Sequence, residues 1–178
     1  MPAEKPAGQA FIKVFATVKK SDLRAAILRH LRDELTRQTN AATMARDEAI
    51  SEESRAESKW DTHSQEAAYL AEGQAKLAVE IAASIELYSA LPLPDFGSDA
   101  VVALGALVEL EAPATRKRSW FFLGPRAGGA QLQIEGREIL VLTPQSPLGR
   151  QLLGRRVGDV VQTPGRGATT GQEIVTIA

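Results

Sequence analysis

Two long stretches of the chain place apolar or small residues at alternating spacings of three and four. In the first stretch the repeat runs through Leu28, Leu31, Leu35, Gln38, Ala42, Ala45 and Ala49, and in the second through Ala67, Leu70, Gln74, Leu77, Ile81, Ser84, Tyr88 and Leu91. This spacing keeps one face of a helix apolar over many turns and is typical of coiled coils. We therefore predict two long helices that pair, the first starting at Ser21 and Asp22.

Each repeat contains one large polar residue, Gln38 in the first and Gln74 in the second. A buried amide needs a hydrogen-bond partner, so we expect the two glutamines to face each other in an antiparallel pair. That register centres the fold-back near residue 56 and gives arms of roughly 28 residues, or about 42 Å. It also sets Leu31 opposite Ile81, Leu35 opposite Leu77, Ala42 opposite Leu70 and Ala45 opposite Ala67. A second register, with the turn at 60–64, also fits the charges.

The segment between the two repeats is acidic. In the first register its carboxylates crowd onto the tip of a long, thin hairpin: Glu52, Glu53, Glu57 and Asp61. An acidic run between two helices is usually only a solvated turn, so the pattern alone does not establish a function for these four residues.

The pattern changes after Leu91 to Gly97, where two prolines and a glycine end the second helix. Six short strand-like runs follow, at 106–111, 119–123, 131–134, 139–142, 157–162 and 173–177. Between the fourth and fifth runs, Ser146 to Gly154 has a serine cap, a proline and a final glycine, which indicates one short helix.

These elements predict an α+β fold, in which an N-terminal antiparallel α-helical coiled-coil hairpin precedes a small antiparallel β-sheet domain with one short helix. We divide the chain into an N-terminal tail (1–20), the hairpin (21–91), a linker (92–98) and a head (99–178).

Composition removes several classes of chemistry. The 178 residues contain no cysteine, which excludes disulfides, thiolate zinc sites and a cysteine nucleophile. Two histidines make an imidazole metal cluster unexpected, and a net charge of −1 gives no global field toward nucleic acid or anionic membranes. The sequence shows neither a secretory signal nor an apolar run long enough to cross a bilayer. We expect a cytoplasmic protein that does not bind membranes.

Three segments of the head resemble a known family: GALVELE at 105–111, FFLGP at 121–125 and SPLGRQLLGRRVGDVV at 146–161. They look like the C-terminal domain of the bacterial GreA/GreB transcription elongation factors, and the last segment is the most specific. The order of parts, a helical hairpin before the head, is also similar to that family. The resemblance covers about residues 21–178 and implies an FKBP-like head.

The resemblance implies a protein that binds bacterial RNA polymerase, with the head on the rim of the secondary channel and the hairpin inside it. We expect it to be a monomer. The tip acids Glu57 and Asp61, with Glu53 and Glu52, would act on the Mg²⁺ of the polymerase active site and stimulate cleavage of backtracked transcripts. Carboxylate oxygens suit this hard cation. The chain would then need no cofactor of its own, would not be an enzyme alone, and would contact nucleic acid only within the elongation complex.

The hairpin tip departs from the family. The family motif Gly-Asp-x-x-Glu-Asn-Ala-Glu-Tyr is absent, and the nearest pieces are 56–61, which aligns Glu57 with the second acid of the motif, and 65–69. The alternative is a regulator that occupies the secondary channel and modulates or inhibits RNA polymerase without cleavage.

The head carries two basic clusters, Arg116 to Arg118 and a second one after the short helix. We favour partner contact for both, although arginines after a helix also interact well with its C-terminus. The residues that we assign to partner binding are Ser146, Pro147, Leu148, Arg150, Arg155 and Arg156.

Overall fold

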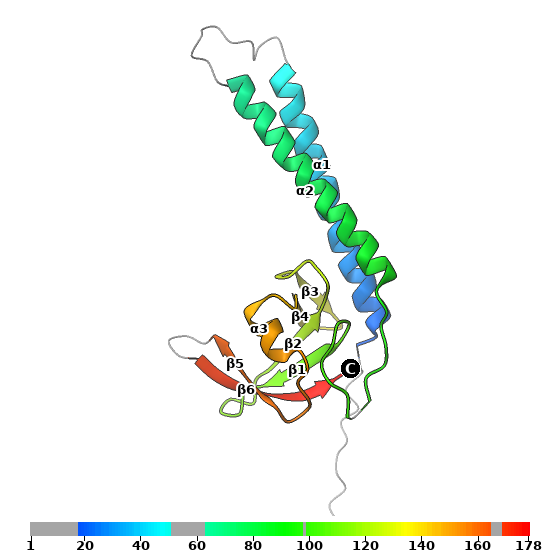
Figure 1. Cartoon of the computed structure of the whole chain (residues 1–178), viewed down its shortest axis with the longest axis vertical. Coiled ribbons are helices and arrows are strands. Elements are labelled where there is room, and N and C mark those ends of the chain that lie inside the picture. The colour runs from blue at the N-terminus through cyan, green and yellow to red at the C-terminus, as the bar shows by residue number, and fades with distance from the viewer. Residues whose placement is uncertain (1–17, 51–62, 98, 165–168) are drawn as a thin grey trace, which may run out of the picture.

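The computed structural model describes residues 18–50, 63–97, 99–164 and 169–178, apart from the side chains of Ala49, His63, Ser64, Pro164 and Thr169. Two long helices, α1 (Lys20–Ile50) and α2 (His63–Ala90), run antiparallel and stand on a β-sheet head (Figure 1). None of the helices in this part of the chain combines the length and hydropathy that a bilayer crossing requires.

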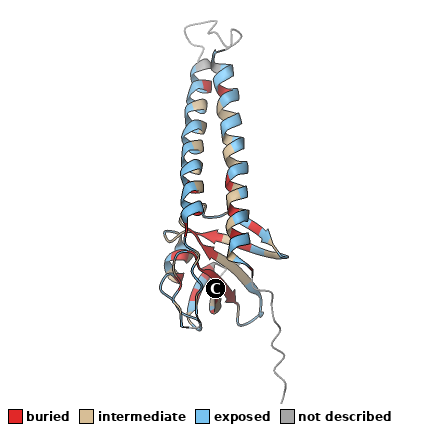
Figure 2. Ribbon diagram, turned by 90° about the vertical axis from the view of Figure 1, so that its right-hand side faces the viewer, coloured by how far each residue is buried: buried red, intermediate tan, exposed pale blue. Residues whose placement is uncertain are grey.

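The hairpin follows the predicted register in its main features. Helix α1 ends at Ile50 and α2 begins at His63, so His63 and Ser64 belong to α2, which contradicts the second register with its turn at 60–64. Leu31, Ala45 and Ala67 are buried in the seam. Figure 2 shows that burial is concentrated at the hairpin base and in the head, while most of the shaft is exposed.

Two details of the predicted seam are wrong. Leu70 and Leu77 are 54% and 46% exposed, because the small residues Ala71 and Ala78 are turned further toward α1. The glutamines do not bond to each other: the Gln38 amide donates to Glu34 Oε1 at 2.6 Å, and the amide oxygens of Gln38 and Gln74 have no partner among the described residues. A carboxylate one turn away on the same helix attracts the amide more strongly than a neutral amide across the seam.

The head is a single six-stranded sheet with the strand order β3-β4-β2-β1-β6-β5. Its strands are β1 (Leu107–Glu111), β2 (Arg118–Leu123), β3 (Gln131–Ile134), β4 (Arg137–Leu142), β5 (Val160–Pro164) and β6 (Thr169–Ile177). All neighbouring pairs are antiparallel except β2 and β4, which are parallel. The short helix α3 (Pro147–Leu152) lies between β4 and β5 in the sequence. The predicted α+β class is confirmed, with one parallel pair that the sequence analysis did not foresee.

Alternation along the strands gives the sheet two apolar faces. The face toward α3, which we call the α3-side core, contains Val102, Ala106, Val108, Leu110, Leu123, Leu142, Leu152, Val161, Ile174 and Ile177. The other face, the hairpin-side core, joins sheet residues to the hairpin base: Val18, Leu23, Ile27, Leu31, Tyr88, Leu91, Leu107, Phe122, Leu132, Ile139 and Val141. The hairpin base and the head therefore share one apolar cluster.

Tyr88 makes the polar contact within this shared cluster. Its side chain is fully buried, and its hydroxyl donates to the carbonyl oxygen of Arg126 at 2.6 Å. Burial raises the pKa of the Tyr88 phenol above its ordinary value, because the charged phenolate would lose its hydration.

The raised pKa predicts a loss of stability at alkaline pH. The neutral phenol stabilises the fold fully below the unfolded-state value of 10.0, and this contribution is lost as the pH rises from there toward the higher folded-state value. At neutral pH, Tyr88→Phe lacks the hydrogen bond and should have a free energy of unfolding about 1 kcal/mol lower than wild type. Above the unfolded-state value of 10.0, the stability of wild type relative to Tyr88→Phe should fall by about 1.4 kcal/mol per pH unit. Denaturant unfolding between pH 8 and 11.5 measures both proteins. A stability difference that does not change with pH would contradict the prediction.

Candidate partner-binding site

The acids assigned to the tip, Glu52, Glu53, Glu57 and Asp61, lie outside the described residues. Among the residues that are described, no three His, Cys, Asp or Glu side chains are grouped closely enough to hold a metal ion. The candidate site that the structure does describe is the surface around α3.

Helix α3 starts where its sequence predicts. The Ser146 hydroxyl accepts a hydrogen bond from the Gly149 amide at 3.1 Å and donates to the Thr143 carbonyl at 2.8 Å. Pro147 follows at the first helical position, where a missing amide hydrogen costs nothing. Gly149 is buried against the preceding turn, since a Cβ there would lie 2.0 Å from the Thr143 carbonyl oxygen. Helix α3 is thus held tightly at the end of β4.

Beside α3 lies an apolar hollow of about 470 Å³. It is lined by Leu140 and Leu142 of β4, by Ser146, Pro147, Leu148 and Gln151 at the helix, and by Gln162 of β5. Three residues assigned to partner binding from the sequence, Ser146, Pro147 and Leu148, are therefore brought together in one hollow.

Two hydrogen bonds join the Gln151 side chain to the Gln162 backbone at the polar end of this hollow. The Gln151 amide nitrogen donates to the Gln162 carbonyl at 3.0 Å, and the Gln151 amide oxygen accepts from the Gln162 backbone amide at 2.9 Å. Because β5 is an edge strand, its outer backbone groups would otherwise be open to another strand. Gln151 thus fixes α3 to β5 and covers part of the sheet edge.

The three arginines of the second basic cluster have different surroundings. Arg155 Nε donates to the Gln151 carbonyl at 3.3 Å, near the end of α3, and the Arg156 guanidinium donates to the Asp99 carbonyl at 2.5 Å. Both side chains therefore hold the head together while remaining at the surface. Arg150 is exposed and lies within α3, next to Gln151 of the hollow.

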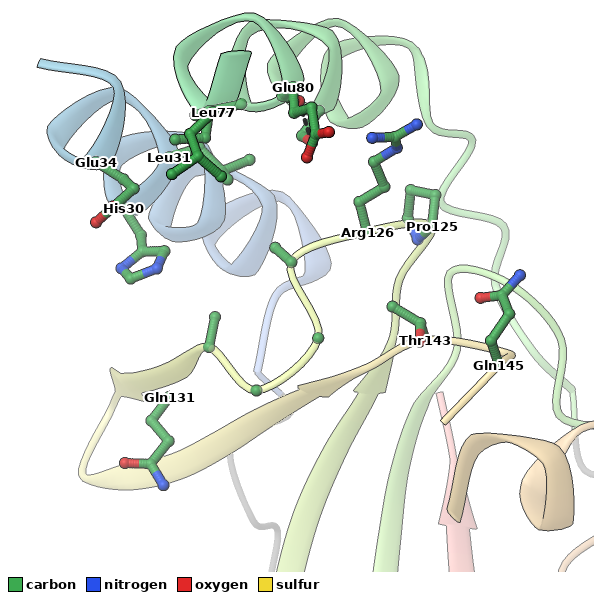
Figure 3. A pocket seen from close by; sticks show the side chains of 16 residues that line it. His30, Leu31, Glu34, Leu77, Glu80, Pro125, Arg126, Gln131, Thr143 and Gln145 are labelled. Carbon is green, nitrogen blue, oxygen red and sulfur yellow. Dashed lines mark hydrogen bonds between the residues drawn. The ribbon is translucent and has the colours of Figure 1, made fainter. Parts of the chain in front are cut away.

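A second hollow, of about 1020 Å³, occupies the inside corner between the hairpin base and the head (Figure 3). The helices contribute His30, Leu31 and Glu34 from α1 and Leu77, Glu80, Ile81 and Ser84 from α2, and the head contributes 125–131, Thr143 and Gln145. The charged groups stand on both walls, with Glu34 and Glu80 on the helices and Arg126 on the loop after β2. Hydrogen bonds from Gln38 and Arg37 lower the pKa of the Glu34 carboxyl, so it is ionised at neutral pH.

The two hollows are neighbours in the sequence of the head. Thr143 and Gln145 line the corner hollow, whereas Leu142 and Ser146 line the apolar hollow. The turn over 143–146, fixed by Ser146 and Gly149, separates them.

The first basic cluster is largely neutralised within the head. Arg118 bonds to Glu111 Oε2 at 2.9 Å and to Glu109 Oε1 at 3.1 Å, and Arg116 pairs with Glu111 Oε1 at 2.6 Å. The Thr176 hydroxyl donates to the remaining oxygen, Glu109 Oε2. The charge of Glu109 in particular raises the pKa of Arg118. The cluster is thus an ion-pair network over two buried carboxylates, which weakens its interpretation as a free basic surface.

This network predicts unequal effects of two arginine substitutions. Arg118→Met should lower the free energy of unfolding by about 2 kcal/mol, because it leaves buried carboxylates with fewer partners. The loss is smaller than for a fully buried pair, since the Arg118 side chain is 43% exposed. Arg116→Met, at a side chain 80% exposed, should cost less than about 1 kcal/mol. Equal losses in denaturant unfolding would contradict the network.

Sequence reasoning missed the polar partner of α3 and the contact of Tyr88 with the head. Gln151 and Gln162 are eleven residues apart, and no local pattern signals their pairing. The apolar repeat places Tyr88 in the helix seam and does not indicate its contact with Gly124 and Arg126 of the head. The one available signal was Gly124 itself, a glycine after a strand, which can mark close approach of another group.

The protein thus consists of a helical hairpin and a six-stranded sheet head. The apolar hollow beside α3 is the candidate docking surface of the head. Residues 97–178 match the family model described as "Transcription elongation factor, GreA/GreB, C-term". This part of the chain is therefore similar to the GreA/GreB C-terminal domain, in agreement with the resemblance drawn from the sequence. The likeness of the head to the FKBP fold stays a prediction.

The relatives include one curated protein and several solved structures. The transcription inhibitor protein Gfh1 of Thermus aquaticus is 32% identical over 88 residues. The matched region is 49% of the length of this chain and 54% of the length of that relative. The structure of Gfh1 from Thermus thermophilus is 22% identical, with a TM-score of 0.37, over 88% of this chain and 93% of that one. The structure of the prokaryotic transcription elongation factor GreA/GreB from Nitrosomonas europaea is 20% identical, with a TM-score of 0.36, over 59% of this chain and 78% of that one.

Proposed function

We propose that this protein binds bacterial RNA polymerase, with its head on the rim of the secondary channel and its hairpin inside the channel. The observation that supports this most is the match of residues 97–178 to the GreA/GreB C-terminal domain. The 31 residues of α1 give the hairpin a reach of about 46 Å, enough to project well beyond the head. In this proposal the protein is a regulator of another enzyme and works as a monomer in the cytoplasm.

The docking surface in this proposal is the apolar hollow beside α3, with Arg150 at its side. An apolar side chain of the polymerase would insert between Leu140 and Leu148, and Arg150 would meet an acidic group at the rim of the contact. A desolvated apolar anchor inside a polar rim is the usual arrangement of an energetically important contact.

The hollow gives a direct test of docking. Leu148→Asp places a carboxylate in it and should weaken binding to RNA polymerase by on the order of 100-fold, or about 3 kcal/mol. Leu153→Asp is the matched control, because Leu153 is 48% exposed at the end of α3 and does not line the hollow. Equilibrium binding of both variants to the polymerase measures the difference. Equal binding by Leu148→Asp and wild type would exclude the hollow as the docking surface.

The activity that we propose is stimulation of transcript cleavage in backtracked complexes. The tip acids Glu52, Glu53, Glu57 and Asp61 would supply carboxylate oxygens beside the Mg²⁺ of the polymerase, which is the ligand type that this ion prefers. The chain would then need no cofactor of its own.

A second candidate function is regulation of RNA polymerase without cleavage. Two observations favour it: the 32% identical relative is a transcription inhibitor protein, and the family's tip motif is absent from this chain. This candidate predicts slower or altered RNA synthesis by the wild-type protein, with transcripts of unchanged length.

One experiment separates the two functions. Purified protein is added to a backtracked elongation complex with end-labelled RNA and Mg²⁺, and binding to polymerase is measured in the same sample. Shortened transcripts that require the polymerase support cleavage stimulation. Confirmed binding with full-length transcripts supports the regulator. Absence of binding at micromolar protein would overturn the proposed function as a whole.

A further inference from the structure

Three segments of the chain meet where the hairpin joins the head: the start of α1, the end of α2 and the linker that follows α2 (Figure 1). The first two supply residues to the hairpin-side core, including Leu23, Ile27, Tyr88 and Leu91, which pack with Phe122 and other sheet residues. The joint is therefore a packed interior and not a flexible tether.

Tyr88 occupies a slot at this joint that has room for its phenol and for little else. A Cβ on Gly124 would lie 2.0 Å from the Tyr88 hydroxyl oxygen and 3.0 Å from the ring carbon that carries it. Gly124 is held in place by its own amide, which donates to the Leu142 carbonyl at 2.8 Å. The hydroxyl then bonds to the Arg126 carbonyl, two residues further along the same loop. The phenol ring of Tyr88, on α2, is thus fixed against the ends of both β2 and β4.

The linker is fixed by contacts of the same kind. Lys20 of α1 donates to the Pro94 carbonyl, and its ammonium lies 4.7 Å from the centroid of the Phe96 ring. On the head side, Gly105 has a φ of +87°, and a Cβ there would lie 2.9 Å from the Pro92 carbonyl oxygen. The linker therefore has close contacts with both α1 and the head, which limits rotation of the hairpin.

We infer that Tyr88 is a positioning residue that sets the angle between the hairpin and the head and holds the two as one rigid body. The purpose of this angle rests on the proposed function, because the head would dock while the tip acts at a distance. A rotation of 10° about the joint would move the end of a 46 Å arm by roughly 8 Å. Since displacements of about 1 Å at a reacting centre can cost about 100-fold in rate, a small change at Tyr88 would matter at the tip.

The inference can be tested on the free protein by distance measurements between spin labels, because the natural chain contains no cysteine. One pair, Ala83→Cys on α2 and Glu138→Cys on β4, spans the joint. The control pair, Arg29→Cys and Ala83→Cys, lies within the hairpin. All three positions are exposed. Wild type should give one narrow distance for each pair.

The decisive variant is Gly124→Ala, whose added methyl group collides with the Tyr88 hydroxyl. We expect the distance across the joint to shift or broaden while the distance within the hairpin stays the same. Adding Tyr88→Phe removes the oxygen and should reduce the shift in the mean distance across the joint, so that the double variant resembles Tyr88→Phe alone. An unchanged distance in Gly124→Ala, or a shift that Tyr88→Phe does not reduce, would overturn the role of the phenol.

If Gly124→Ala proves insoluble, Tyr88→Phe alone decides the question, since loss of the bond to Arg126 should broaden the distance across the joint only. An unchanged distribution would overturn the inference. These measurements need no polymerase, so their outcome is independent of the proposed function. A rigid joint in a protein that does not bind polymerase would overturn only the function, and a loose joint in one that binds would overturn only this inference.

Discussion

Replacement of Glu52, Glu53, Glu57 and Asp61 together by alanine should leave binding to RNA polymerase unchanged and reduce transcript cleavage by at least about 100-fold. In the proposed function the head provides the docking surface, and the tip provides only carboxylates to a metal site. Substitution of groups around a metal commonly costs 10-fold to 100-fold even where they do not touch the ion. Gel analysis of end-labelled RNA from a backtracked complex measures the effect.

The matched control replaces four acids on the shaft, Asp33, Asp47, Glu72 and Glu86, which are all exposed. Both variants change the net charge by the same amount, so a general electrostatic effect would appear equally in both. Cleavage that persists in the tip variant would contradict the assignment of these acids. Equal loss in both variants would show that total charge matters and not the tip.

Gly149→Ala should destabilise the head by about 3 kcal/mol or more and abolish docking. Helix propensity alone predicts the opposite, because alanine is favoured over glycine inside a helix by about 1 kcal/mol. Packing decides the sign here: the new Cβ would lie 2.0 Å from the Thr143 carbonyl oxygen and 2.8 Å from the Ser146 hydroxyl. To avoid that overlap, α3 would have to leave the end of β4, which would open the hollow that we propose for docking.

The chain offers a control with the same chemical change and the opposite expectation. Gly73 lies inside α2, and a Cβ added there would have no side chain or neighbouring element within 4 Å, so Gly73→Ala should raise stability by about 1 kcal/mol. Denaturant unfolding of the two variants measures both signs. A stabilising effect of Gly149→Ala would mean that α3 does not pack as described.

The sequence predicted the elements well because their signals are local. The serine cap and proline of α3, the prolines after α2 and the strand-like runs act over a few residues, and each corresponds to an element or an element end in the structure. The fifth run was predicted too early, at 157–162, whereas β5 is Val160–Pro164. The register of the hairpin also followed from the seam, although α2 is rotated enough to expose Leu70 and Leu77. Small side chains of α2, such as Ala71 and Ala78, can face α1 instead of these leucines. The apolar repeat alone therefore does not determine the rotation of α2 about its own axis.

The features that the sequence did not predict depend on residues brought together by pairing. The sequence analysis favoured partner contact for Arg118, because Glu109 and Glu111 approach it only when β1 pairs with β2. The parallel pairing of β2 with β4 likewise depends on the path of the chain through β3. Tyr88 and Gly124 are separated by 36 positions, and a glycine after a strand can mark a close approach without indicating which residue approaches. Candidate docking residues could be named from the family resemblance, but not the hollow that they line.

The shared hairpin-side core also limits how such proteins could exchange parts during evolution. A hairpin taken from a relative would bring its own residue at the position of Tyr88, whereas the slot over Gly124 would stay with the recipient head. A larger side chain would not enter the slot, and a smaller one would not donate the hydrogen bond that the Arg126 carbonyl accepts from Tyr88. Recombination that crosses between residues 88 and 124 is therefore expected to yield functional chimaeras only when both halves of the joint come from compatible parents.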